Sequence, residues 1–169
     1  MDPGFRLGLP EMTQGTTSHD TFETTQELER TVAETMWSIR PTDVSWDSLV
    51  YVHNQIGGLG SSITKIFHQG AVIDRRSIVK EVAFTVDDLR EAMYKPGKGS
   101  WLSMTLTVTP AGNGWEADYN YTEKPVWELG EPVNDTYAQE LYLFPRDEDH
   151  IPDWFKEEMK GATWTPEDA

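Results

Sequence analysis

The fold is decided by residues 100–121, which read SWLSMTLTVTPAGNGWEADYNY. In the first half of this stretch apolar and polar residues alternate. One face carries Leu102, Met104, Leu106 and Val108, and the other carries serine and threonine. This alternation predicts a β-strand with one buried face.

A turn and a second strand follow. Pro110 has no N–H to donate to a strand ladder, and Gly112-Asn113-Gly114 tolerates the positive φ angles of a tight turn. The next residues alternate again, with aromatic side chains on one side and Glu116 and Asp118 on the other. The stretch therefore predicts a β-hairpin, and we expect it to form the centre of an antiparallel sheet, because a hairpin alone is only marginally stable.

The residues before this hairpin predict one helix and then a meander of strands. Apolar residues at helical spacing predict a helix from Phe22 that ends at Arg40. Period-2 runs separated by glycine turns predict strands over residues 46–54, 62–68, 71–73 and 78–84. Thr85 is a suitable N-cap for a short middle helix that ends before Pro96.

After the hairpin, prolines interrupt an irregular stretch, and two helices are predicted at residues 134–143 and 152–160. The expected fold class is α+β: an antiparallel β-sheet meander packed with an N-terminal helix, a middle helix and C-terminal helices. We expect a single domain over residues 21–161, a disordered arm over residues 1–20 and a tail over residues 162–169. Met12 offers an alternative start, in which case residues 1–11 are not native.

Length and composition exclude several classes of protein. The chain has 169 residues and 37% hydrophobic content, which suffices for one domain with its own core. It has no cysteine, which removes disulfides, thiol nucleophiles and cysteine-based zinc sites. No run resembles a signal peptide or a membrane span, so we expect a cytoplasmic protein with no membrane partner.

The net charge of −15 is unevenly distributed along the chain. Residues 1–45 carry 8 acids and 3 bases, residues 46–115 carry 6 and 7, and residues 116–169 carry 15 and 4. This sign argues against binding of nucleic acid, whose phosphates are contacted by lysine and arginine. Two interpretations remain: a solubilising surface, or a surface that attracts a basic protein.

No arrangement of residues predicts catalysis. The four histidines lack metal-ligand spacing, and the Gly57–Ser62 loop lacks the lysine and the following helix of a phosphate-binding loop. We therefore expect no enzyme, no cofactor and no metal. An enzyme with an unrecognised acidic site, built from Glu116, Asp118 and a histidine, stays open as an alternative.

A second alternative is a module that binds a small ligand or has a structural role. This alternative is favoured if the aromatic side chains of Trp115, Tyr119 and Tyr121 line a cavity instead of a packed core.

The last third of the chain interleaves acidic residues with large aromatic ones, a composition suited to capture of a basic protein. Trp154 is a candidate anchor at the centre of such a surface. The competing interpretation is an ordinary amphipathic helix with its aromatic residues inward and its acids outward. The candidate partner-binding residues are Asp147, Glu148, Asp149, Asp153, Trp154, Glu157 and Glu158.

Several segments resemble the YezG-like immunity proteins, the antitoxins of bacterial polymorphic-toxin systems. They are Asp88-Leu89-Arg90, residues 100–108 and residues 116–121, while Leu143–Arg146 and Ile151–Trp154 are similar to the end of actinobacterial members. The resemblance implies an α+β domain that binds and neutralises a cognate toxin, in several relatives a nuclease. It implies no catalytic residue. The acidic end and the longer N-terminal arm depart from the family pattern, so the candidate contact residues rest on charge.

Overall fold

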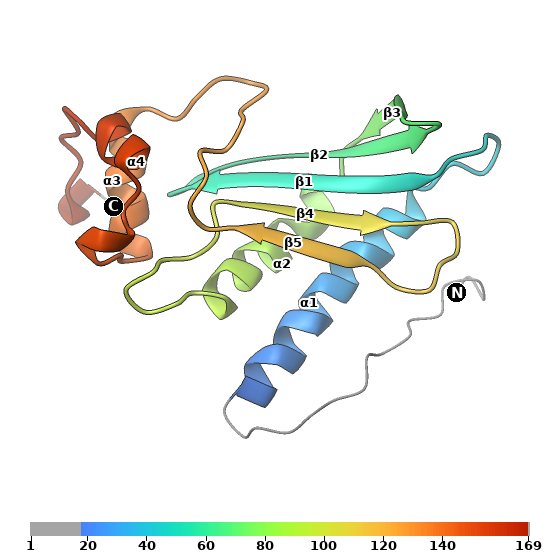
Figure 1. Ribbon diagram of the computed structural model, residues 1–169, viewed down its shortest axis with the longest axis horizontal. Helices are drawn as coiled ribbons and strands as arrows, with labels where there is room; N and C mark the ends of the chain where they lie inside the picture. The colour runs from blue at the N-terminus through green and yellow to red at the C-terminus, as the bar shows by residue number, and fades with distance from the viewer. Residues whose placement is uncertain (1–17, 169) are drawn as a thin grey trace. The chain divides into compact units, whose positions relative to one another are not determined.

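The computed structural model describes residues 18–168. Within these residues the chain forms five strands and four α-helices, with helices before, between and after the strands along the chain (Figure 1). The helices are α1 (Ser18–Ser38), α2 (Val79–Ala92), α3 (Asn134–Leu143) and α4 (Asp153–Glu158), with short 3-10 turns η1 (Glu148–His150) and η2 (Pro166–Asp168). The strands are β1 (Ser48–Ile56), β2 (Leu59–His68), β3 (Ala71–Arg76), β4 (Ser103–Val108) and β5 (Glu116–Asn120). The predicted α+β class is confirmed.

The strands form one antiparallel sheet in the order β3-β2-β1-β4-β5. The predicted hairpin is present as β4 and β5, and the predicted inward face of β4 is buried. Its expected position is wrong, because β1 is the central strand and β5 lies at an edge. The reason is the connection through α2, which returns the chain to pair β4 with β1.

The predicted strand over residues 78–84 is also wrong, because these residues begin α2. Ile78 and Val82 are buried, whereas Phe84 is 85% exposed. This burial follows the four-residue spacing of a helix and continues through Val86 and Leu89. The helix thus begins at Val79, six residues before the cap expected at Thr85.

The ends of the chain differ from the sequence prediction. Residues 1–17 of the expected arm lie outside the described residues, and the last three residues of that arm belong to α1. The expected tail is held to α3, because the backbone N–H groups of Thr163 and Trp164 donate to Oδ1 of Asp135 at 2.7 and 3.1 Å. Asp135 therefore accepts bonds from the tail, and Val133 occupies the N-cap position of α3.

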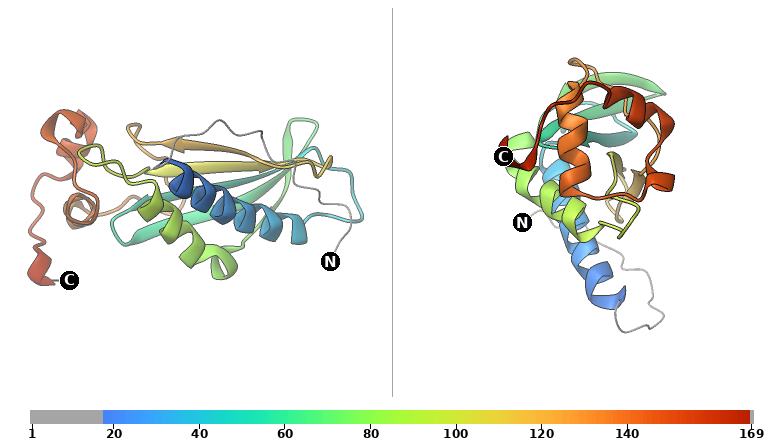
Figure 2. Two further views of the ribbon diagram at one scale, coloured as in Figure 1. Left: turned by 90° about the horizontal axis from the view of Figure 1, so that it is seen from below. Right: turned by 90° about the vertical axis from the view of Figure 1, so that its left-hand side faces the viewer.

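The chain divides into two compact units. The first comprises residues 1–52, 62–92 and 105–118, of which the structure describes those from 18 onward. In this unit α1 and α2 pack against each other along one face of the strands (Figure 2). Its core contains Val32, Ala33, Met36, Leu49, Tyr51, Ile66, Ile78, Val82, Val86, Leu89, Leu106 and Val108.

The second unit comprises residues 53–61, 93–104 and 119–169 and contains α3 and α4. Four buried residues form its core, and five partly buried ones pack against them. The buried residues are Ile56, Leu102, Tyr137 and Phe155, and the surrounding ones are Trp127, Leu141, Ile151, Trp154 and Met159.

The turn after β1 is fixed to α3 inside this second unit. The N–H of Gly57 donates to Oε2 of the buried Glu140 at 2.7 Å. Gly57 has a φ of +54°, and a Cβ built there would lie 2.7 Å from the carbonyl oxygen of Thr136. Glycine is therefore required at this position by both its backbone conformation and the close approach of α3.

Candidate functional site

The predicted acidic contact residues all lie in the second unit, on η1, on α4 and at their ends. Five of the six acids are exposed, and Glu158 is half-buried. The structure therefore presents most of these carboxylates to solvent, as a partner surface and a solubilising surface both require.

Three of these acids pair with lysines of the same unit, and a fourth lies near a histidine. Lys124 contacts both Glu158 and Glu131, Lys156 lies 3.6 Å from Glu148, and Lys160 contacts Glu157. Asp147 lies 4.0 Å from Nδ1 of His150. The lysine pairs neutralise part of the negative charge that we expected to attract a basic partner.

Asp149 and Asp153 differ from the other four acids. Both are exposed, and neither forms an ion pair within residues 18–168. Asp153 lies in the first turn of α4 and Asp149 in η1, so the two carboxylates are carried on adjacent short helical turns. They are the acids of the predicted set that remain available to a cation from outside.

Trp154 is part of the core of the second unit. Its indole N–H donates to the carbonyl of Thr122 at 2.7 Å, and its ring contacts Tyr137 and Phe155 at centroid distances of 6.3 and 5.4 Å. The neighbouring Phe155 is fully buried. Trp154 therefore packs into the core and positions α4. This agrees with the competing interpretation, in which the aromatic residues of the helix face inward.

The exposed apolar residues of this unit lie elsewhere, in the segment between β5 and α3. Val126, Leu129 and Val133 are 83%, 92% and 68% exposed. We call residues 123–133 the acidic-aliphatic loop, because it also carries three glutamates. Sequence analysis overlooked these aliphatic residues because they have no helical or strand period.

The acidic-aliphatic loop is fastened to its unit at three points. Trp127 packs into the core cluster, and the carbonyl of Val126 accepts a bond from Asn54 Nδ2 at 2.7 Å. Lys124 links Glu131 of the loop to Glu158 of α4. The exposed aliphatic side chains are therefore presented by an anchored segment beside α4.

The charge asymmetry along the sequence does not carry over to the folded units. Among residues 18–168, the first unit has 14 acids and 7 bases, and the second has 13 and 6. Each unit therefore has a net charge of −7. The difference disappears because β5 contributes Glu116 and Asp118 to the first unit, while the loop before β4 contributes Lys95 and Lys98 to the second.

The residues of the two alternative functions occupy different places. Glu116 and Asp118 are exposed on β5 in the first unit. Trp115 donates from its indole N–H to the carboxylate of Glu29 at 2.8 Å, and Tyr119 packs on Trp101 at a centroid distance of 5.7 Å. Tyr121, by contrast, lines a pocket.

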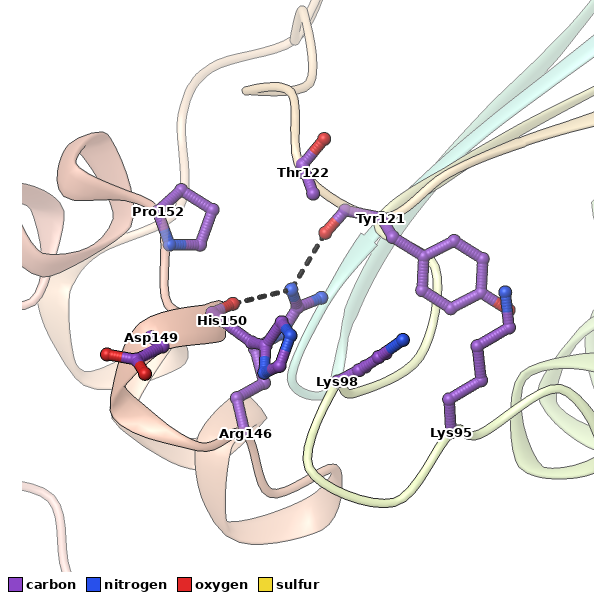
Figure 3. A pocket seen from close by; sticks show the side chains of 8 residues that line it. All are labelled: Lys95, Lys98, Tyr121, Thr122, Arg146, Asp149, His150 and Pro152. Atoms are coloured by element: carbon purple, nitrogen blue, oxygen red, sulfur yellow. Dashed lines mark hydrogen bonds between the residues drawn. The ribbon is translucent and has the colours of Figure 1, made fainter.

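That pocket lies within the second unit and has a volume of about 370 Å³. Figure 3 shows its lining, which comes from the loop before β4, the residues directly after β5 and the segment around η1. The lining residues are Lys95, Lys98, Tyr121, Thr122, Arg146, Asp149, His150 and Pro152. Three of them carry a positive charge, so the pocket combines basic groups with the exposed Asp149.

Arg146 holds the three walls of the pocket together. One guanidinium nitrogen, Nη1, donates to the carbonyls of Tyr121 at 2.8 Å and His150 at 3.3 Å, and Nη2 donates to the carbonyl of Ser100 at 2.9 Å. A Cβ built at Gly99 would lie 2.4 Å from Nε of Arg146. The glycine, which has a φ of +79°, therefore permits the arginine to lie against the loop.

No cluster of three or more metal-ligating side chains occurs within residues 18–168. Over the same part of the chain, no helix is long and apolar enough to cross a membrane. Comparison with known proteins does not extend these observations: no protein-family model matches the chain, and no characterised protein shows a significant match to it.

Proposed function

We propose that this chain is an immunity-type protein that binds and neutralises a cognate bacterial toxin in the cytoplasm. The toxin is a basic protein domain, and the acidic surface of the second unit contacts it. The proposal assigns no catalytic role and no cofactor to the chain.

The observation that carries the proposal is that one unit presents both unpaired carboxylates and exposed aliphatic side chains. Asp149 and Asp153 are exposed and form no ion pair within the described part of the chain, and Leu129 is 92% exposed. Protein interfaces combine an apolar centre, which loses water, with a polar rim that sets orientation and association rate. The acidic-aliphatic loop supplies the first and the carboxylates of η1 and α4 supply the second.

The chemistry of the partner follows from the sign of these charges. A toxin that cuts nucleic acid needs a positive cleft for phosphate groups, and a fixed array of carboxylates competes for such a cleft. The resemblance of residues 88–90, 100–108, 116–121, 143–146 and 151–154 to the YezG-like immunity proteins supports the same class of partner. An ordinary solubilising surface would not need Val126 and Leu129 exposed in the same unit as these acids.

The proposal is tested by co-expression in a bacterial host. The full chain is produced together with the basic C-terminal domain of a secreted protein encoded by the adjacent gene, and growth is measured. We expect the domain alone to stop growth and the wild-type chain to restore it. An adjacent gene of this type is itself part of the prediction, and a metabolic operon in its place would contradict it.

A charge-matched pair of variants tests the surface. Asp149→Asn with Asp153→Asn removes two unpaired carboxylates from the second unit, whereas Glu116→Gln with Asp118→Asn removes two exposed carboxylates from the first. We expect the first pair to weaken protection and the second to retain it. Equal loss in both pairs would refute the assigned surface, and failure of the wild-type chain to protect would refute the immunity function.

A further inference from the structure

The pocket of the second unit is a positively charged site in an acidic protein. Its lining contains Lys95, Lys98 and Arg146 but one carboxylate, that of Asp149. The unit around it has a net charge of −7. A cluster of positive charges in a unit with net negative charge points to a function, because a surface that only keeps the protein soluble would not need such a cluster.

Neither lysine forms an ion pair with a carboxylate of the described residues. Both Lys95 and Lys98 are exposed. Figure 3 shows the carboxylate of Asp149 pointing away from both lysine side chains. The other lysines of this unit, Lys124, Lys156 and Lys160, all contact carboxylates.

The lysines are carried on a rigid turn. The N–H of Lys95 donates to the carbonyl of Gly99 at 2.9 Å, and the N–H groups of Gly99 and Lys98 return bonds to the carbonyl of Lys95 at 3.0 and 2.8 Å. The carbonyl of Gly97 accepts the N–H of Asp147 at 2.7 Å. The turn is thus fixed to the segment that forms the opposite wall, so the site is formed before any ligand arrives.

An aromatic ring orients one of the two ammonium groups. Nζ of Lys95 lies 4.1 Å from the centroid of the Tyr121 ring. The hydroxyl of that tyrosine donates to the carbonyl of Met93 at 2.8 Å, which fixes the ring. A cation–π contact leaves the ammonium hydrogens available for an anion, since the ring is not a competing charge.

We propose that this pocket binds a small phosphate monoester. Both Nη atoms of Arg146 already donate hydrogen bonds to backbone carbonyls. A carboxylate therefore cannot form the two parallel hydrogen bonds with this guanidinium that bidentate pairing needs. Lysine acts as a point charge, which suits a phosphate with several equivalent oxygens. The phosphate lies at Lys95 and Lys98, and the organic part of the ester lies against Tyr121 and Pro152.

The size of the pocket restricts the ester. Its volume of about 370 Å³ is near the lower end of the range of about 300 to 1,000 Å³ for small-molecule sites. This space suits a mononucleotide or a sugar phosphate and not a dinucleotide. The inference goes beyond toxin neutralisation, because it needs the pocket and not the acidic-aliphatic loop, and either one can fail alone.

Calorimetric titration of the full chain tests the site. The probes are adenosine monophosphate and glucose 6-phosphate, which distinguish nucleotide from sugar ester, with adenosine and glucose as uncharged controls. We expect at least one ester to bind with a Kd below about 1 mM and its uncharged control not to bind. Binding of neither ester up to about 10 mM would overturn the proposal.

One double and one single variant locate the binding, and a double variant of equal charge elsewhere in the unit is their control. Lys95→Met with Lys98→Met removes the proposed phosphate contacts and keeps apolar side chains, and Lys98→Met alone removes the one that contacts no ring. Because a charge-assisted hydrogen bond contributes about 1.5 to 3 kcal/mol, we expect each lysine removed to weaken binding at least about tenfold.

Lys156→Met with Lys160→Met is the control, since it removes two positive charges from α4 and the residues after it. We expect this control to bind the ester within about twofold of wild type, the range of an exposed charge effect. Equal weakening in both doubles, or wild-type affinity in the Lys95/Lys98 double, would overturn the site.

Discussion

Replacement of Tyr137 by phenylalanine should stabilise the protein. Tyr137 is fully buried in the core of the second unit, and its hydroxyl finds no hydrogen-bond partner within residues 18–168. Its ring contacts Phe155 at a centroid distance of 5.2 Å, a contact that phenylalanine retains. An unsatisfied buried polar group costs about 1 to 3 kcal/mol, so we expect Tyr137→Phe to raise the unfolding free energy by about 1 kcal/mol near pH 8.

The gain should grow in alkaline solution. Burial raises the pKa of Tyr137 from 10.0 to about 12, with the charge of Glu158 as a smaller cause. Below pH 10, the pKa of tyrosine in the unfolded chain, Tyr137 is protonated in both the folded and the unfolded state, so its titration does not lower the unfolding free energy. Between pH 10 and pH 12 the unfolded state loses the proton first, so the wild type is destabilised by up to about 1.4 kcal/mol per pH unit.

The variant lacks this loss because phenylalanine has no proton to release. Burial also raises the pKa of Tyr51 to about 12, but that tyrosine is present in both proteins and cancels from their difference. Urea unfolding followed by fluorescence of the seven tryptophans gives both free energies at pH 8 and pH 11. A variant less stable than wild type at pH 8, or a difference that does not increase toward pH 11, would refute the reasoning.

Two other comparisons test the two units separately. Gly57→Ala and Gly70→Ala both place alanine at a positive φ, +54° and +76°, which costs about 1 to 2 kcal/mol in each case. The two variants differ in the space around the added Cβ, which lies 2.7 Å from the carbonyl oxygen of Thr136 at position 57 but has no atom within 4 Å at position 70. In thermal unfolding Gly57→Ala should therefore be the less stable of the two, and equal stability would contradict the close approach of α3. Leu89→Ala, on the buried face of α2, should cost about 2 to 5 kcal/mol, whereas Phe84→Ala, at 85% exposed, should change stability by less than about 0.5 kcal/mol. The reverse order in urea unfolding would contradict a helix over residues 79–92.

Local patterns in the sequence predicted most of the elements. The alternation through β4 and the glycine turn after it are short-range signals, and both are present. The turn between β2 and β3 is another, since Gln69 and Gly70 both have positive φ, as tight hairpin turns require. The error at residues 78–84 arose because Val82 and Phe84 also fit an alternating pattern. Only the packing of α2 against α1 distinguishes the two.

The order of the strands could not be predicted in the same way. The hairpin of β4 and β5 has the clearest pattern but lies at one side of the sheet. Local alternation does not indicate which strand β4 pairs with after the α2 connection. The prediction that negative charge gathers in one part of the molecule also failed, because the fold brings residues distant in the sequence into one unit. Lys95 and Lys98 precede the acidic third of the chain and yet fold into its unit.

The candidate site was predicted in part. Exposure of most of the acids follows from their charge. The sequence placed Asp153, Glu157 and Glu158 on the last helix, whereas the 3-10 turn that carries Glu148 and Asp149 was expected to be a loop. Lys124 pairs with Glu158, which is 34 residues away in the sequence, so this pair depends on the tertiary structure. For the same reason, the sequence could not show which acids would remain without an ion pair, namely Asp149 and Asp153. The exposed Leu129 and the pocket at Tyr121 likewise arise from segments that only the fold brings together.

The most direct test of the proposed function is the affinity of the purified chain for the basic toxin domain as a function of salt concentration. If Asp149 and Asp153 attract that domain, the affinity should fall steeply as salt rises, and Asp149→Asn with Asp153→Asn should make this dependence shallower. The first-unit pair Glu116→Gln with Asp118→Asn should keep the wild-type dependence. An affinity indifferent to salt, or the same salt dependence in both variants, would contradict binding through the acidic surface of the second unit.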